Sequence, residues 1–199
     1  RTEGITLEDI NLAYLVENTV EFNQYIADML WAQDYALANR EHMMNNALKV
    51  FFNYVGFGKE IQRINCHHNF TQKEMHNGEW LWITRKGAIK ADHGDFGVIP
   101  GSMGARSYIV EGLGNSLSYN SCSHGAGRTM SRSEAKKKVS VEELNTAMVG
   151  KTWNSDMATA LLDEAPQAYK PIDVVMEDQK DLVSIVHELR QVFNFKGVK

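Results

Sequence analysis

The sequence contains little cysteine and no long apolar run. Its two cysteines, Cys66 and Cys122, lie beside histidine and serine motifs and form no spaced disulfide framework, which is typical of a reduced environment. No stretch approaches the ~20 apolar residues of a membrane span, and Arg1–Gly4 carry no apolar signal-peptide core. We therefore expect a cytoplasmic protein without a membrane partner.

The sequence also has only a small excess of negative over positive charge. The 199 residues carry a formal net charge of -4, and 43% are hydrophobic and 23% charged. These values exclude disorder, collagen and coiled-coil rods, and the negative balance argues against histone-like binding. Any contact with nucleic acid must therefore come from a local basic patch. Because the first residue is Arg1, we expect a processed chain or a piece of a longer polypeptide.

Hydrophobic periodicity predicts a long amphipathic helix near the N-terminus. The helix begins at Thr19 and is ended by Gly56 and Gly58, and a shorter helix is expected from Thr6 to Val16. The apolar residues of the long helix recur at three- and four-residue steps. They are Tyr25, Ile26, Met29, Leu30, Ala36, Leu37, Met43, Met44, Ala47, Leu48, Phe51 and Phe52.

Short β-prone runs separated by glycines follow this helix. The expected strands are residues 80–84, 96–99, 107–110 and 116–119. Two short helices are expected at 131–138 and 141–149, with Ser140 capping the second, and the tail from Pro171 mixes helix with strand. Since no repeat and no break in composition marks a linker, we predict one α+β unit with a mixed, sheet-rich core.

Two adjacent histidines, His67 and His68, follow Cys66. In an extended segment alternate side chains point to opposite faces, so at most one of the two histidines faces a given site. Imidazole is a common ligand of transition metals, and a buried histidine bonded to backbone is the alternative. No HxxxH or CxxC spacing supplies a second local ligand, so the sequence does not complete a metal site by itself.

A glycine-rich segment, Ser121–Arg128, surrounds His124. Small residues let backbone N–H groups approach a bound phosphate, and a histidine placed there can be a nucleophile toward phosphorus. Arg128 and Arg132 are one helical turn apart, which on a helix would place both guanidiniums on the phosphate side. The alternative is a glycine-rich loop that leads into a solvated basic helix.

Two further segments give weaker signals. Pro100–Gly104, with Ser107, is a Gly/Ser turn after a predicted strand, and it can offer amides and hydroxyls to a nucleotide. Taken singly, such a segment is more often only a turn. Arg85 and Lys86 add two cations that are either phosphate or RNA contacts or solvated rim charges.

Five blocks in order resemble the RtcB family of RNA ligases, which join an RNA 3'-phosphate or 2',3'-cyclic phosphate to a 5'-hydroxyl with GTP and manganese. The ordered set is highly specific, and with the long helix and the segment Leu189–Gly197 the resemblance covers nearly the whole chain. The blocks are Cys66–Phe70, Thr84–Ala88, Ile99–Gly104, Ser123–Arg128 with Met130–Arg132, and Asp163–Pro166 with Ala168–Lys170.

The resemblance implies a role for each matched position. His124 would attack GTP and become a covalent histidine-GMP intermediate, and His68 would be one manganese ligand. Tyr169 and Lys196 would contact the guanine. The guanylate would be cradled by Asn69, Pro100, Gly101, Ser102, Met103, Ser107, Gly125, Ala126 and Gly127. Phosphates of GTP or RNA would be held by Arg85, Lys86, Arg128 and Arg132.

The resemblance also implies that part of the metal site lies elsewhere. The family uses an aspartate and a cysteine from its N-terminal half, a Gly-Asn-His segment and a His-Ser-Gly-Ser-Arg-Gly segment, and none of these occurs here. The expected partners are therefore RNA with 3'-phosphate and 5'-hydroxyl ends and a complementary N-terminal half, with an archease-type activator as a further candidate. The alternative is a noncatalytic guanine-nucleotide or RNA-binding relic without the metal half.

Overall fold

The computed structural model describes residues 7–9, 11 and 13–197. The chain divides into two compact units, Arg1–Lys59 and Glu60–Lys199, although no break in composition marks their junction. The first unit contains the long helix and the second contains the sheets and short helices. The predicted α+β class is confirmed, and the candidate site residues all belong to the second unit.

The first unit is dominated by α1, Val20–Val55, at the predicted position. The Thr19 side chain accepts a hydrogen bond from the Phe22 N–H (3.2 Å), which caps the first turn. Gly56 adopts a left-handed φ of 78° and donates its N–H to Phe52 O (2.8 Å), which ends the helix. In the described part of the chain no helix is apolar over a sufficient length to cross a membrane.

The short helix expected from Thr6 to Val16 does not extend over the last four of these residues. Residues 13–16 form no regular secondary structure, and Thr6, Ile10 and Leu12 lie outside the described residues. The signal was only local, a capping residue followed by two acids, and isolated helices of this length are marginal in water.

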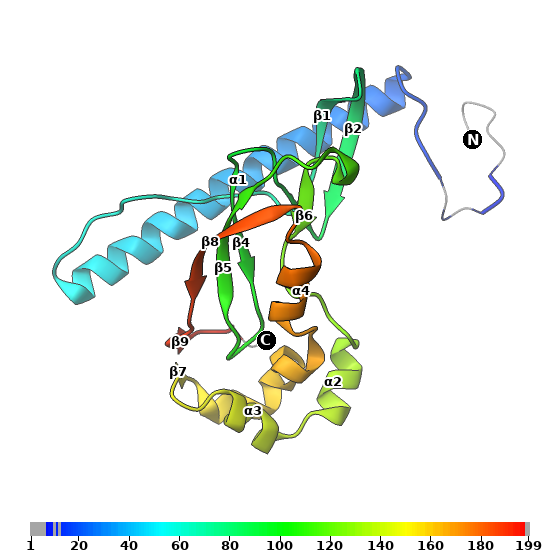
Figure 1. The fold of residues 1–199 in the computed structure, drawn as a ribbon. Coiled ribbons are helices and arrows are strands. Elements are labelled where there is room, and N and C mark those ends of the chain that lie inside the picture. Colours follow the sequence, from blue (N-terminus) through cyan, green and yellow to red (C-terminus); the bar gives the residue numbers. More distant parts are fainter. Residues whose placement is uncertain (1–6, 10, 12, 198–199) are drawn as a thin grey trace. The chain divides into compact units, whose positions relative to one another are not determined.

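The second unit consists of short elements, which Figure 1 labels. In chain order they are β1 (Asn69–His76), β2 (Glu79–Lys86), β3 (Ala88–Lys90), β4 (Phe96–Pro100), β5 (Ser107–Gly112), η2 (Ser116–Ser118), β6 (Ser121–Ser123), α2 (Arg132–Lys138), α3 (Val141–Ala147), β7 (Thr152–Trp153), η3 (Ser155–Glu164), η4 (Pro166–Ala168), α4 (Ile172–Asp178), β8 (Val183–Leu189) and β9 (Phe193–Asn194).

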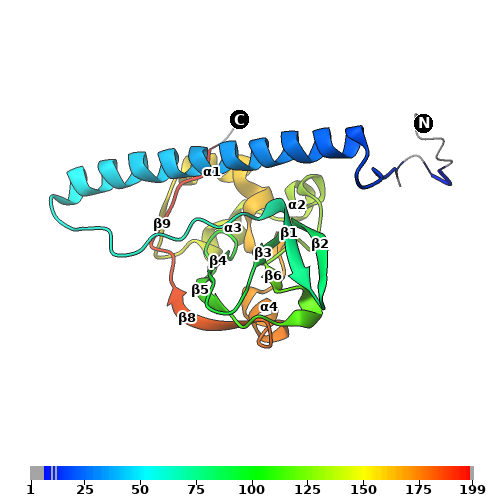
Figure 2. The ribbon, with the colours of Figure 1, turned by 90° about the horizontal axis from the view of Figure 1, so that it is seen from above.

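Within residues 60–197 the strands form four small sheets. β1 and β2 are an antiparallel hairpin, and its turn residues Asn77 and Gly78 both have positive φ, as a tight hairpin turn requires. β3 pairs with β6, and the three-stranded sheet has the order β4-β5-β8. The short strands β7 and β9 pair in parallel. α4 lies beside β5 and β8 (Figures 1 and 2), where the Tyr108 hydroxyl donates to Asp173 Oδ1 (2.7 Å).

Most of the expected elements of this unit are confirmed. The strand predictions at 80–84, 96–99 and 107–110 fall inside β2, β4 and β5, and the tail forms α4 and β8. Ser131 and Ser140 cap α2 and α3, and Ser140 forms a reciprocal capping box with Glu143.

The strand expected at 116–119 is wrong. Ser116–Ser118 form the 3-10 helix η2, because the Asn115 side chain accepts the Leu117 N–H (2.9 Å) and caps it. Tyr119 and Asn120 then adopt positive φ values of 51° and 50°, which no strand tolerates. Local capping therefore overrides the β propensity of this run.

Two buried clusters form the core of the second unit. One joins β3, β4, β5 and β6 to α4 through Ile89, Ile99, Val110 and Met176. The other joins α2 and α3 to η3, with Leu144 at its centre. Tyr169 is only partly buried and packs against both clusters, so the residues around it are fixed by both parts of the core.

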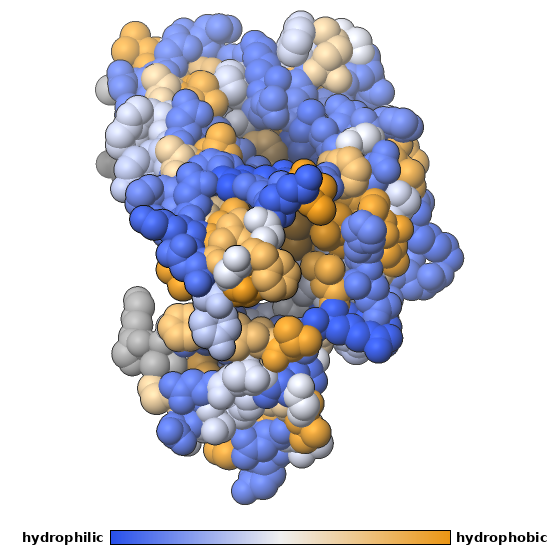
Figure 3. All heavy atoms as spheres, turned by 90° about the vertical axis from the view of Figure 1, so that its left-hand side faces the viewer, coloured by the Kyte–Doolittle hydropathy of each residue, from blue (hydrophilic) through white to orange (hydrophobic). Residues whose placement is uncertain are grey.

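The edge strand β8 and the segment after it leave apolar side chains exposed, and Figure 3 shows hydrophobic residues at the surface of one face. Ile185, Val192 and Phe193 are 54%, 75% and 61% exposed. An exposed apolar strand edge favours association. We predict that the isolated chain self-associates, and that changing Ile185 and Val192 together to lysine reduces this association, measured by light scattering.

The matched control is Leu117→Lys in η2. Leu117 is 92% exposed but does not belong to the β8 edge, so its replacement should leave the association unchanged. A wild-type chain that remains monomeric at high concentration would contradict the prediction.

Candidate active site

Gly87 joins the two histidines of the candidate site. Its N–H donates to His68 O (3.0 Å) at the start of the hairpin, and its carbonyl accepts the N–H of His124 (3.3 Å) just after β6. Gly87 has a φ of 71°, which favours glycine. The Asn69 side chain accepts from the same Gly87 N–H (3.2 Å) and fixes the junction from the other side.

The rings of His68 and His124 stack on each other. Their centroids are 5.6 Å apart and their planes differ by 9°. A Cβ atom on Gly87 would lie 3.5 Å from His124 Cε1, so the glycine backbone lies against the nucleophile candidate. The ring centroid of His67 instead lies 5.4 Å from that of Phe70, which agrees with the expectation that only one of the adjacent histidines faces the site.

The two glycine-containing loops meet beside His124. The Ala126 N–H donates to Pro100 O (3.2 Å), and a Cβ on Gly125 would lie 3.2 Å from the same oxygen. The Gly101 N–H donates to Ser107 Oγ (3.3 Å). The predicted cradle segments are thus neighbours, but several of their groups bond to one another here.

Ser102 and Met103 complete the turn after β4. Ser102 O accepts the Ala105 N–H (3.1 Å), so Ser102 helps to close the turn. Met103 is 2% exposed and packs in the second core cluster with Leu144. Its side chain anchors the turn, so only its backbone is available to a guanylate.

Glu164, which the sequence reasoning did not single out, collects the cations and the tyrosine of the site. Its Oε1 accepts from Arg132 Nη1 (2.7 Å) and Arg128 Nη2 (3.2 Å). Its Oε2 accepts from the Tyr169 hydroxyl (2.9 Å) and Lys196 Nζ (3.1 Å). Burial would raise the pKa of Glu164, but these donors hold it below its ordinary value.

Tyr169 ties this cluster to the His124 loop. Tyr169 and Arg128 form an isolated antiparallel bridge, and the Lys170 N–H donates to Gly127 O (3.0 Å). The Arg128 guanidinium lies 4.5 Å from the centre of the Tyr169 ring and donates to its hydroxyl (2.7 Å). Burial and the bond to Glu164 raise the pKa of Tyr169 to about 12, so the phenol stays protonated.

The expected helical stacking of Arg128 and Arg132 is wrong. α2 begins at Arg132, and Arg128 lies in the bridge before it. The two guanidiniums still converge, because both donate to Glu164. Arg132 also pairs with Asp163 (2.7 Å).

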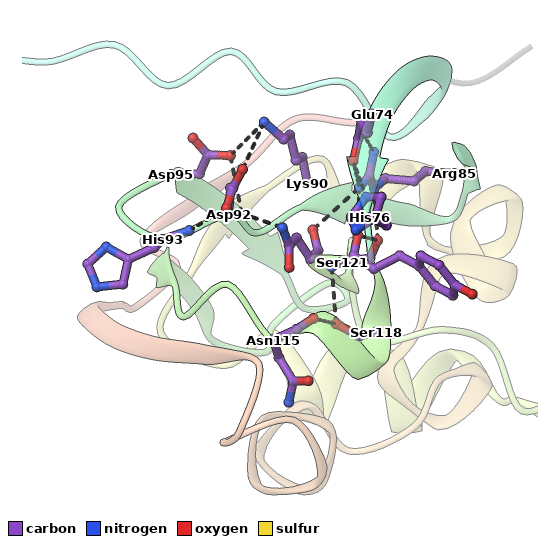
Figure 4. Close-up of polar contacts among 12 residues, drawn as sticks. Glu74, His76, Arg85, Lys90, Asp92, His93, Asp95, Asn115, Ser118 and Ser121 are labelled. Atoms are coloured by element: carbon purple, nitrogen blue, oxygen red, sulfur yellow. Dashed lines mark hydrogen bonds and ion pairs between the residues drawn. The ribbon is translucent and has the colours of Figure 1, made fainter. Parts of the chain in front are cut away.

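Arg85 lies in a buried network, which Figure 4 shows. It is 2% exposed and donates from Nη1 and Nη2 to Glu74 Oε1 (2.5 Å) and Oε2 (3.0 Å). Its Nε donates to Ser121 Oγ (2.9 Å) in β6, three residues before His124. This geometry gives Arg85 a structural role, and its contact with RNA stays a prediction. Lys86 is exposed at the end of β2.

The described residues provide few metal ligands, and the thiol nearest to His124 in the sequence, that of Cys122, is buried. No group of three or more His, Cys, Asp or Glu side chains in that part of the chain lies together so as to hold a metal ion. Burial raises the pKa of the Cys122 thiol to about 12, so this cysteine beside the His124 loop stays protonated. The assignment of His124 as the nucleophile stays a prediction of the family resemblance.

Two acids, Glu74 and Glu164, organise the site and were missed as functional residues. Glu164 stands in a block that resembles the RtcB family, which was the available signal. Glu74 gave no signal beyond its place in a β-prone run, because its partner Arg85 is brought to it by the register of the hairpin.

Comparisons with known proteins agree with the resemblance. The family described as tRNA-splicing ligase RtcB matches residues 1–197. An RNA-splicing ligase RtcB of Escherichia coli K12 is 46% identical over 96% of this chain and 48% of its own length. A tRNA-splicing ligase RtcB of Archaeoglobus fulgidus is 32% identical over 92% of this chain and 42% of its own length. The chain thus spans about half the length of these curated relatives.

The Glu74–Arg85 pair yields a stability prediction. Burial would raise the pKa of Glu74, but hydrogen bonds with Arg85 and His76 hold it below the ordinary 4.5. The charged carboxylate thus stabilises the fold above that pH, and the contribution is lost as the pH falls through the folded-state pKa. Glu74→Gln should lower the free energy of unfolding at pH 7 by about 3 kcal/mol, measured by urea unfolding.

The same variant should lose this acid-dependent part of the stability. Glu79→Gln, at an exposed position on the same hairpin, is the matched control and should change the stability little. Equal stabilities of Glu74→Gln and the control at pH 7 would show that the buried pair does not stabilise the fold.

Proposed function

Because the chain belongs to the RtcB family, we propose that it supplies the nucleophile and guanylate pocket of a GTP-dependent RNA ligase. The ligase would join RNA 3'-phosphate or 2',3'-cyclic phosphate ends to 5'-hydroxyl ends. The observation that supports this most is the stacking of His68 on His124 at the meeting point of two glycine-containing loops. These are the positions to which the family resemblance assigns the metal ligand and the nucleophile.

In the proposed first step, His124 attacks GTP. The lone pair of one imidazole nitrogen forms a bond to the α-phosphorus, and the bond to the bridging oxygen breaks to release pyrophosphate. The junction at Gly87 supports this role, since it fixes the backbone of His124 and leaves a glycine against the ring. A fixed nucleophile reduces the ordering needed to reach the transition state.

In the following steps, guanylate passes to RNA. An oxygen of the RNA 3'-phosphate attacks the phosphorus of the histidine adduct, the phosphorus–nitrogen bond breaks, and the imidazole is restored. The RNA 5'-hydroxyl then attacks the activated 3'-phosphate, loses its proton and expels GMP. Arg128 and Arg132 are proposed to hold phosphates, because one guanidinium can donate two parallel N–H···O hydrogen bonds to a phosphate.

The base would bind at Tyr169 and Lys196. A tyrosine ring can stack on any purine, whereas an ammonium favours the O6 acceptor of guanine over the amino group of adenine. Lys196 Nζ carries three donors, of which one goes to Glu164 in this structure. The guanylate would be cradled by Asn69, Ser107 and the loops Pro100–Met103 and Gly125–Gly127.

Manganese is proposed only through His68. A single imidazole does not make a complete site for this ion, which prefers several oxygen and nitrogen ligands. Since the described residues hold no cluster of three ligands, manganese bound here would need ligands from a complementary N-terminal portion.

We predict that His124→Ala abolishes covalent labelling by radioactive GTP. The assay would assemble the chain with a complementary N-terminal half and manganese, and it would measure an acid-labile, base-stable adduct, as expected for a phosphoramidate. His93→Ala is the matched control, since His93 is exposed in the β3–β4 loop and should leave labelling unchanged.

Labelling of His124→Ala at the wild-type rate would show that the nucleophile is another residue. An assembled wild-type protein that binds GTP but never becomes labelled would favour the noncatalytic nucleotide-binding relic.

We also predict that different residues recognise the base and the phosphates of the nucleotide. Lys196→Met should lose several-fold of the preference for GTP over ATP, because one hydrogen bond from a charged donor is worth roughly 1.5 to 3 kcal/mol. Arg128→Ala should weaken both nucleotides about equally, since phosphate contacts carry no base information. Competition binding with both nucleotides measures the ratio.

Suppose that Lys196→Met kept the GTP-to-ATP affinity ratio while Arg128→Ala changed it. The orientation of the nucleotide would then be reversed, with the base at Arg128 and the phosphates at Lys196.

A further inference from the structure

Glu164 stands between the two sets of residues that the proposed nucleotide would touch. Arg128 and Arg132 reach one of its oxygens, and Tyr169 and Lys196 reach the other. A carboxylate has about four lone-pair sites, so these four donors fill its accepting capacity. Glu164 is therefore not a free acceptor for a ligand, and its contacts are with the residues that would bind one.

We infer that Glu164 is a positioning residue that holds the base-contacting and phosphate-contacting side chains in one arrangement, so that a guanine nucleotide meets both sets at once. The inference rests on the proposed function, because it concerns the same guanylate site. Glu164 lies at the end of η3, whose residues pack in the second core cluster. A rigid element thus fixes four side chains from separate segments of the chain.

The charges around Glu164 support this role. Four cations, Arg128, Arg132, Lys136 and Lys196, pair with two carboxylates, those of Asp163 and Glu164. The surplus is positive, so the cluster attracts an anion. Without Glu164, Arg128 and Lys196 would lose the carboxylate that offsets their repulsion, and long cationic side chains would spread into water.

Two features show that the cluster can still accept a ligand. The Nη1 of Arg128 is buried and has no hydrogen-bond partner among the described residues, although Nη2 has two. A buried donor without an acceptor is costly, and a ligand oxygen would satisfy it. A cavity of about 510 Å³ also opens beside Glu164, lined in part by Arg132 and Lys196.

Charge and positioning predict opposite effects for one substitution. Glu164→Gln keeps the shape of the side chain and removes a negative charge from a site for an anion. If Glu164 acted only through its charge, the variant would bind GTP more tightly. If it positions the four donors, the variant binds GTP more weakly despite the lost repulsion, because a neutral amide holds charged donors less well.

The experiment measures binding of GTP and ATP by calorimetric titration of the full chain. For Glu164→Gln we expect the affinity for GTP to fall at least about fivefold. The preference for GTP over ATP should also decrease, since the carboxylate no longer holds the Lys196 ammonium in place. Glu164→Asp keeps the charge but is one methylene too short to reach all four donors, so it should also lower the affinity for GTP and the preference for GTP over ATP. Glu134→Gln, which removes an exposed carboxylate of α2 paired with Lys138, should change neither value.

A second measurement needs no nucleotide. The Tyr169 phenol is followed by alkaline absorbance titration, as the difference between each protein and its Tyr169→Phe counterpart. Its pKa of about 12 depends on burial and on Glu164, so it should fall toward 10 in Glu164→Gln and stay high in Glu134→Gln.

The two measurements distinguish failure of the inference from failure of the proposed function. A wild-type chain that binds no GTP counts against the guanylate pocket, and the titration of Tyr169 then decides the role of Glu164 alone: a lowered pKa supports it and an unchanged pKa overturns it. Where wild type binds GTP, equal or tighter binding by Glu164→Gln overturns the inference even if His124 becomes labelled.

Discussion

The backbone of one glycine sets the geometry on which the candidate site depends. The Gly87 N–H donates to the carbonyl of His68 and the Gly87 carbonyl accepts the N–H of His124, so a single residue links the backbones of the two histidines. This link allows the rings to stack, and the positive φ of Gly87 lets the chain turn from β2 into β3 at this point. The loops beside His124 are then brought into place by the pairing of β3 with β6.

Two partly buried carboxylates, those of Glu74 and Glu164, contribute to this geometry in different ways. Glu74 holds Arg85, which reaches β6 through Ser121 and so connects the hairpin to the strand that carries His124. Glu164 holds cations that would otherwise repel one another. In the first case every partner is part of the fold, whereas in the second Arg128 Nη1 finds no acceptor within the part of the chain that the structure describes. The first arrangement is that of a structural ion pair, whereas the second contains a buried donor that the proposed nucleotide would satisfy.

What the sequence predicted well depends on neighbours within a few residues. The start of α1 at Thr19 and the box between Ser140 and Glu143 are local events, so their residue types were sufficient. The matched motifs placed His68 and His124 in one site, and the structure brings their rings together.

What the sequence did not predict arises from distant partners or from competing local signals. Glu164 accepts from Lys196 and Arg132, each 32 residues away, and from Arg128, 36 residues away, and no spacing rule encodes such a meeting. At Ser116–Ser118 the β-prone residues form a 3-10 helix instead of a strand, because the side chain of Asn115 caps it. The turn after β4, finally, is tied to a residue 87 positions away, since the Gly104 N–H donates to Gln191 Oε1 (2.8 Å). Loops of that length close slowly, so the β1–β2 hairpin should form early and the candidate site late in folding.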